Sequence, residues 1–151
     1  MEISRSVFVR ATPQQAYDRV SDLPRMGELS SENTGGRWVG GATGPVKGAR
    51  FRGSNRNGVR RWSTTATVEV AEPGRQFAFH VRYYFGIPVS RWTYDFAPAD
   101  EGCTITETWT GLQPWWFKTG AGLFTGVMDR EAATARSIEH TLARVKAALE
   151  T

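Results

Sequence analysis

Between residues 37 and 112, apolar and polar residues alternate in short segments that are separated by turn residues. A two-residue period is typical of strands with one buried face. The segments are 36–40, 49–55, 60–70, 75–84, 89–96 and 104–111, with turns such as Asn57-Gly58 and Glu72-Pro73-Gly74 between them. Residues 3–10 alternate in the same way. Because short connections favour antiparallel neighbours, we expect an antiparallel sheet of about seven strands.

Helical periods flank these strands. Thr12 followed by Pro13 is typical of a helix start, which predicts a short helix that runs through Val20 and is ended or restarted by Pro24. Residues 23–30 predict a second short helix. After Pro114 a stripe with three- and four-residue spacing predicts a long amphipathic helix. The stripe is Phe124, Val127, Glu131, Ala135, Ile138, Leu142, Val145 and Leu149.

These elements predict an α+β fold and a single domain over residues 1–151. A curved seven-stranded antiparallel sheet should wrap the long C-terminal helix, because the apolar face of each needs a partner. Two short helices should follow the first strand.

The alternation divides the strands into an inward and an outward face. We expect these residues to point inward: Phe51, Gly53, Asn55, Trp62, Thr64, Ala66, Val68, Val70, Phe77, Phe79, Val81, Tyr83, Trp92, Tyr94, Phe96, Ile105, Glu107 and Trp109. We expect these residues to point outward: Arg52, Arg61, His80, Arg82, Arg91 and Asp95.

The inward face combines large aromatic side chains with hydrogen-bonding groups. An unpaired buried carboxylate such as Glu107 costs several kcal/mol or raises its pKa, so a strand seldom carries one without a partner. Trp62, Trp92, Tyr94 and Trp109 also carry polar groups that need partners when buried. An interior of rigid rings and hydrogen-bonding groups suits a ligand cavity better than a close-packed core.

Each of these residues also has a purely structural interpretation. Glu107 could lie near a strand end and pair with an arginine, and Asn55 could cap the neighbouring turn. His80 is expected to be a surface neighbour of Asp95 or an arginine. Cys103 is expected to fill space in the core.

The segment 112–129 is a second candidate region, because Trp115, Trp116 and Phe117 stand together just before the helix. Consecutive aromatic residues cannot all point inward. One interpretation is a lid over the cavity mouth, for which Trp116, Phe124 and Met128 would join the ligand-binding set; the other is a homodimer contact. Glu131 on the helix stripe either faces the cavity or lies at the helix edge.

The net charge of +4 and the seven basic residues between positions 35 and 61 raise the question of nucleic-acid binding. Arg50, Arg52 and Arg56 share one parity, which places them on the solvent-facing side of a strand. No recognition-helix or RNP-type pattern accompanies them, so we expect no nucleic-acid partner.

Other sequence features bear on location and metal binding. With a single cysteine and two histidines, we expect no disulfide and no metal site. The chain has neither a secretory-signal layout nor a long apolar run. We therefore expect a cytoplasmic protein without stable membrane insertion.

The order of elements resembles the START-like, helix-grip superfamily, also called SRPBCC, and its polyketide cyclase/dehydrase-like family. The segments that carry the resemblance are 12–30, which looks like the opening helix pair, 68–81, which looks like the strand-turn-strand signature, and 92–109, which looks like the last hairpin. The resemblance implies a deep cavity between sheet and C-terminal helix that holds lipids, sterols, aromatic polyketides or hormones. Many members have no established activity, so fold alone does not assign function.

The leading hypothesis is the binding of a small hydrophobic or aromatic ligand in this cavity, without a cofactor. The expected ligand-binding residues are Asn55, Trp62, Thr64, Phe79, Trp92, Tyr94, Glu107 and Trp109, besides those of the second region. The alternative is a polyketide aromatase/cyclase-type enzyme that uses the same cavity, with Glu107 as base, Tyr94 as acid and Asn55 as the donor that orients a carbonyl. A third hypothesis is a protein-interaction module that uses residues 115–117.

Overall fold

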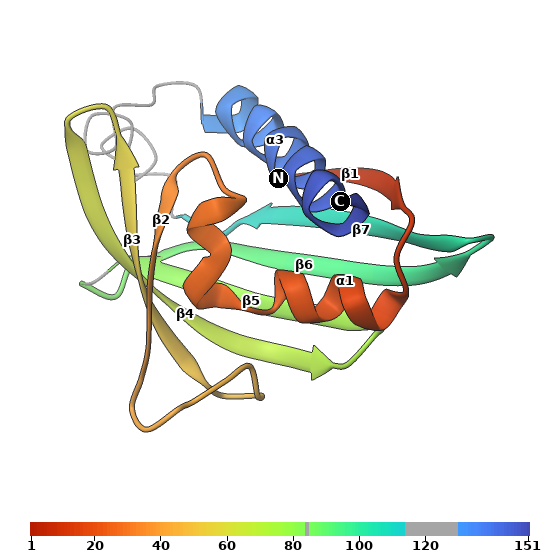
Figure 1. Cartoon of the computed structure of the whole chain (residues 1–151). Helices are drawn as coiled ribbons and strands as arrows, with labels where there is room; N and C mark the ends of the chain where they lie inside the picture. The colour runs from red at the N-terminus through yellow and green to blue at the C-terminus, as the bar shows by residue number, and fades with distance from the viewer. Residues whose placement is uncertain (84, 114–129) are drawn as a thin grey trace.

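The chain folds into one antiparallel sheet with helices on its concave side (Figure 1). This computed structural model describes residues 1–83, 85–113 and 130–151. In chain order the elements are β1 (Glu2–Val9), α1 (Pro13–Val20), the 3₁₀ helix η1 (Leu23–Glu28), β2 (Asn33–Val39), β3 (Arg50–Asn57), β4 (Arg60–Glu72), β5 (Gln76–Tyr83), β6 (Pro88–Ala99), β7 (Gly102–Gly111) and α3 (Arg130–Glu150). The predicted α+β helix-grip architecture is confirmed.

The seven strands follow the order β1-β7-β6-β5-β4-β3-β2, and every neighbouring pair is antiparallel. The strands β2 to β7 form a continuous meander, and β1 joins it beside β7. A two-residue loop connects β6 to β7, because Ala99 pairs with Gly102. Within that loop Glu101 has a φ of 64°, a left-handed conformation that suits a tight turn.

The helix α1 begins where the sequence predicts. Thr12 caps it by accepting a hydrogen bond from the backbone N–H of Gln15, and the Gln15 side chain accepts one from the backbone N–H of Thr12. This reciprocal capping box, with Pro13 in the first turn, satisfies backbone groups that would otherwise lack partners. The second predicted helix is the shorter 3₁₀ helix η1.

Two details of the sheet differ from the predictions. Val70 pairs with Ala78 and therefore lies on the outward face, because the register shifts between Val68 and Val70; Ala71 takes the inward place opposite Phe77. Such a bulge inserts one extra residue and reverses the parity beyond it. The strand β2 begins at Asn33, three residues earlier than expected. The predicted helix stripe before residue 130 lies outside the described residues.

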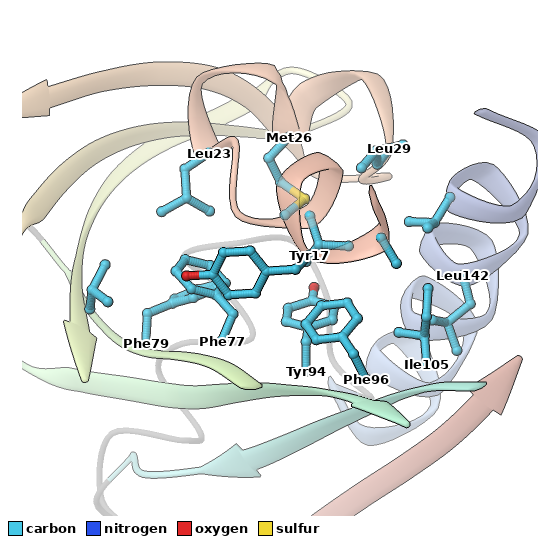
Figure 2. Packing of buried hydrophobic residues seen from close by; sticks show 14 of the residues in the cluster. Tyr17, Leu23, Met26, Leu29, Phe77, Phe79, Tyr94, Phe96, Ile105 and Leu142 are labelled. Carbon is cyan, nitrogen blue, oxygen red and sulfur yellow. The ribbon is translucent and has the colours of Figure 1, made fainter. Parts of the chain in front are cut away.

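Buried aromatic and aliphatic side chains fill one end of the concave face. Tyr17 of α1 makes edge contacts with Phe77 and Phe96, at ring-centroid distances of 6.0 and 5.8 Å. Figure 2 shows Tyr17 over these rings, with Leu142 of α3 near Ile105. The helix α3 packs on β1 and β7, and α1 packs on β6, β7 and α3. This end of the sheet is therefore a closed hydrophobic core.

Candidate functional site

Beyond that core, the concave face encloses a cavity of about 410 Å³. Its floor is formed by inward residues of β3 to β7, and its other walls come from Leu23 and Met26 of η1 and from the N-terminal half of α3. The cavity lies between the sheet and the C-terminal helix, where the sequence analysis expects one. Its size falls within the range of small-molecule pockets.

The sheet residues that we expected to bind a ligand all line this cavity. Those that line it are Asn55, Trp62, Thr64, Phe79, Trp92, Tyr94, Glu107 and Trp109. That these side chains bind a ligand is a proposal, which we take up below. The other three expected residues, Trp116, Phe124 and Met128, lie outside the described residues, as do the proposed lid and the aromatic triplet at 115–117.

Three paired rings form the centre of the floor, and we call them the aromatic row. Trp109 of β7 is the cross-strand partner of Trp92 of β6, which is in turn the partner of Phe79 of β5. Cross-strand partners project from the same face of a sheet, so the three rings stand side by side. The aromatic row offers a flat apolar ligand a surface for stacking and dispersion contacts.

Glu107 and Tyr94 occupy the next inward position along β7 and β6, beside the aromatic row and next to the packed core. The Tyr94 hydroxyl donates a hydrogen bond of 2.8 Å to Glu107 Oε2. Only 1% of Glu107 is exposed. The second oxygen, Oε1, is buried and has no hydrogen-bond partner among the residues that the structure describes.

The environment favours the neutral form of the carboxyl. Burial raises the pKa of Glu107 to about 8, and the Tyr94 hydrogen bond offsets only part of that increase. Burial also raises the pKa of Tyr94, and the neighbouring carboxyl adds to the effect. The alternative that Glu107 lies near a strand end and pairs with an arginine is wrong, because Glu107 is fully buried and bonded to Tyr94.

A second polar cluster lies at the far end of the cavity. Asn55 Nδ2 donates to Thr64 Oγ1 at 3.0 Å, and Asn33 is the cross-strand partner of Asn55. Ala71 of β4 lies in the same cross-strand row as Glu107. Thr64 is three inward positions away from Ala71 along β4, which is about 20 Å of strand length. The aromatic row lies between the two polar ends, so the cavity is polar, then aromatic, then polar along its length.

The helix α3 contributes hydroxyl groups that the sequence analysis did not identify. Thr134, Ser137 and Thr141 line the cavity, at spacings of three and four residues. The predicted apolar stripe drew attention to Ile138 and Leu142, which pack in the core beside them. Small hydroxyl residues that recur at helical spacing next to an apolar stripe are a signal that could have identified this wall. Glu131 also lines the cavity, although its side chain is exposed.

The outward face carries conventional surface chemistry. His80 is the cross-strand partner of Arg91, and both contact Glu69 on β4, at 3.2 and 2.9 Å. This confirms His80 as a surface neighbour of an arginine. Cys103 is fully buried in the core, as expected. Among the described residues, none gather into a group that could hold a metal ion, and none of the helices is long and apolar enough to cross a membrane.

Known proteins share this fold across nearly the whole chain. The polyketide-cyclase-like protein Cgl2372 of Corynebacterium glutamicum is 31% identical, with 98% of this chain and 90% of that one covered at a TM-score of 0.66. The di-domain ARO/CYC protein StfQ of the steffimycin biosynthetic pathway is 15% identical, with 98% and 50% covered at a TM-score of 0.75. The Aha1 dimer of Colwellia psychrerythraea is 13% identical, with 99% and 96% covered at a TM-score of 0.68. The last two likenesses show the fold alone.

No functionally curated protein matches the sequence. A family model, by contrast, matches residues 1–150, and its description is polyketide cyclase / dehydrase and lipid transport. That match, the helix-grip topology and the identity with Cgl2372 agree. The chain belongs to the polyketide cyclase/dehydrase and lipid transport family.

Proposed function

We propose that the protein binds a small hydrophobic or aromatic ligand, such as a polyketide or lipid, in the cavity between the sheet and α3. One observation carries the proposal: a cavity of about 410 Å³ is lined by an aromatic row with hydrogen-bonding groups at both ends. A ligand that suits this lining is elongated, with a flat apolar body and polar groups near its ends. The description of the family, which includes cyclases and lipid transport, supports this ligand class.

The composition of the lining supports a binding site over a poorly packed core. Protein interiors are normally close-packed, so the side chains around a cavity of this size forgo many dispersion contacts with other protein atoms. A ligand that fills the cavity restores those contacts. Polar groups among apolar walls would give the site its selectivity.

Filling the cavity from the protein side tests this proposal. Ala66 lies in the middle of the floor, so Ala66→Phe should place a ring in the space meant for the ligand. We expect this variant to weaken binding of the neutral fluorescent probe N-phenyl-1-naphthylamine by roughly tenfold or more, because steric overlap costs more than the tenfold equivalent of about 1.4 kcal/mol. Fluorescence titration measures the affinity, and thermal unfolding shows that the variant is folded.

Thr67→Phe is the matched control. Thr67 follows on the same strand and is the cross-strand partner of His80, on the outward face. The added ring therefore cannot enter the cavity, and probe affinity should equal that of the native protein. Equal affinities of the two variants would contradict the proposal. Native mass spectrometry of the freshly purified protein would also identify a ligand that co-purifies with the native chain and is missing from Ala66→Phe.

A second candidate function is catalysis of the polyketide aromatase/cyclase type in the same cavity. The observation that favours it is the buried pair of Glu107 and Tyr94, because burial brings the pKa of this carboxyl near neutral pH, where general acid and base catalysis is most effective. Asn55, at the other polar end, would orient a carbonyl of the substrate.

Glu107→Gln separates catalysis from binding. The amide keeps the shape of the side chain but cannot transfer a proton at neutral pH, so turnover of a poly-ketone substrate should fall by about a hundredfold or more while affinity is largely retained. Product analysis by liquid chromatography measures turnover. Retained turnover would remove Glu107 from the mechanism.

A further inference from the structure

We propose that Glu107 selects for a neutral ligand that carries an acceptor oxygen, such as a ketone, by donating a hydrogen bond from a protonated carboxyl at Oε1. This inference rests on the proposed ligand-binding function and specifies the chemistry of one end of the ligand. Tyr94 acts as a positioning residue that holds the other oxygen of the same carboxyl.

The geometry supplies the first step of the argument. The Tyr94 hydroxyl occupies Oε2 at 2.8 Å, so Oε2 is the acceptor of the pair. Oε1 is the remaining site, it is buried, and it has no partner within the described part of the chain. Glu107 lines the cavity. A buried polar atom without a partner costs free energy, and a ligand atom in the cavity could supply what is missing.

The protonation state of the Glu107 carboxyl determines whether Oε1 donates or accepts a hydrogen bond. A carboxylate accepts only, whereas a carboxylic acid has one O–H to donate. Because burial raises the pKa of Glu107 to about 8, the acid form prevails at neutral pH. With Tyr94 donating to Oε2, the acid proton resides on Oε1. The group that satisfies it is therefore an acceptor, and a ketone or ether oxygen serves without bringing a charge into the apolar site.

Within the part of the chain that the structure describes, no cation lines the cavity to reverse this preference. Arg5 on β1 is the cross-strand partner of Glu107, yet its guanidinium binds Glu139 on α3 at 3.4 Å and the backbone oxygen of Ser4 at 2.8 Å. The other titratable groups that line the cavity, among the described residues, are Glu32, Tyr83, Tyr94 and Glu131. None of these four carries a positive charge, so ionisation of Glu107 is unfavourable until the solution becomes alkaline.

The experiment compares two neutral tricyclic probes, 9-fluorenone and fluorene, which differ by one ketone oxygen. Equilibrium dialysis gives the ratio of their affinities for the native protein, for Glu107→Met and for Glu107→Gln. Methionine fills similar space without a donor, so we expect the ratio of ketone to hydrocarbon affinity to drop by about tenfold, the usual value of one hydrogen bond. Glutamine retains an N–H donor and should keep the native ratio.

The pH dependence gives a second readout that a merely structural role would not produce. The native ratio should be constant from about pH 6 to 7 and should fall as the pH rises through about 8, whereas the ratio for Glu107→Gln should not change. Carbon-13 NMR of the glutamate carboxyls should show one resonance that titrates near pH 8 and is missing from Glu107→Gln.

The outcomes separate this inference from the proposed function. An equal ratio in the native protein and Glu107→Met, or an ordinary titration of the Glu107 carboxyl, would overturn the role of Glu107 while leaving ligand binding intact. Failure of both probes and of N-phenyl-1-naphthylamine to bind the native protein would overturn the proposed function and this inference with it. Binding of both probes with the predicted shifts supports both.

Discussion

The concave face of the sheet has two ends with opposite characters. At the end covered by α1 and α3, Phe77, Phe96 and Ile105 are buried among other apolar side chains. At the other end, Thr64 and Trp92 border a cavity, and hydroxyl and amide groups mix with the rings. The side chains at both ends come from the same sheet and project from the same concave face. The comparison indicates that one end stabilises the fold while the other leaves space for a ligand.

Glu107 and Tyr94 lie at the boundary between these ends. Their strand neighbours on one side are Ile105 and Phe96 of the core, and on the other side Trp109 and Trp92 of the aromatic row. The neighbouring core excludes water from the carboxyl, and among the described residues one of its two oxygens has no hydrogen-bond partner. The boundary position therefore explains both the raised pKa and the unsatisfied atom.

The largest expected effect is on the free energy of unfolding, and it compares a ring in the core with a ring that borders the cavity. Phe77→Ala should lower the free energy of unfolding by about 3 to 5 kcal/mol, because it leaves a hole in close-packed surroundings. Trp92→Ala removes a larger side chain, but Trp92 is only partly buried and borders the cavity, so fewer packing contacts are lost and we expect about 1 to 2 kcal/mol. Urea denaturation measures both values.

Phe77→Leu is the control for volume, and it should cost much less than Phe77→Ala because most of the space stays filled. Equal destabilisation by Trp92→Ala and Phe77→Ala would contradict the distinction between a packed core end and a cavity end. That result would mean that the rings around the cavity are as tightly packed in solution as the core.

A smaller effect concerns the pH dependence of stability. The pKa of Glu107 is about 8 in the folded protein, against 4.5 for an ordinary glutamate, so between these values the folded state holds a proton that the unfolded state releases. The stability that Glu107 contributes is fully present below about pH 4.5 and is lost as the pH rises to about 8. Relative to Glu107→Gln, the native protein should lose about 2 to 3 kcal/mol between about pH 5 and pH 7.

Glu69→Gln is the matched control and has the smallest expected effect. Glu69 lies on the outward face of the same sheet, where Arg91 and His80 contribute hydrogen bonds that lower the pKa of its carboxyl despite partial burial. The stability that Glu69 contributes is present above the ordinary carboxyl pKa and is lost only as the pH falls. We expect this contribution to be no more than about 1 kcal/mol. A similar loss on alkalinisation in native protein and Glu107→Gln would contradict the assignment of a raised pKa to Glu107.

The alternation of the strands was enough to predict the fold and the floor of the cavity. Period two placed Glu107, Trp92 and Trp109 on the concave face, and β6 and β7 have no interruption between these positions and their shared turn. Val70 was assigned to the wrong face, because an inserted residue leaves no clear mark in an alternating sequence.

The partners within the site were harder to predict. The hydrogen bond between Tyr94 and Glu107 depends on the register of two strands, and the hydroxyl wall of Thr134 and Thr141 depends on the rotation of α3 over the sheet. Both are tertiary relationships, which a residue's own period does not encode. The shift in the pKa of Glu107 depends in turn on how completely the surrounding side chains exclude water.

The two-residue loop of Asp100 and Glu101 has a consequence for how related chains should be compared. Counting back from the pair Ala99 and Gly102, the fifth pair along brings Tyr94 opposite Glu107. One residue more in that loop would slide β7 against β6 and turn the acid away from the phenol, with both residues still in the sequence. Homologues that carry a matching tyrosine and glutamate therefore share this buried acid only if their hairpins also have the same length.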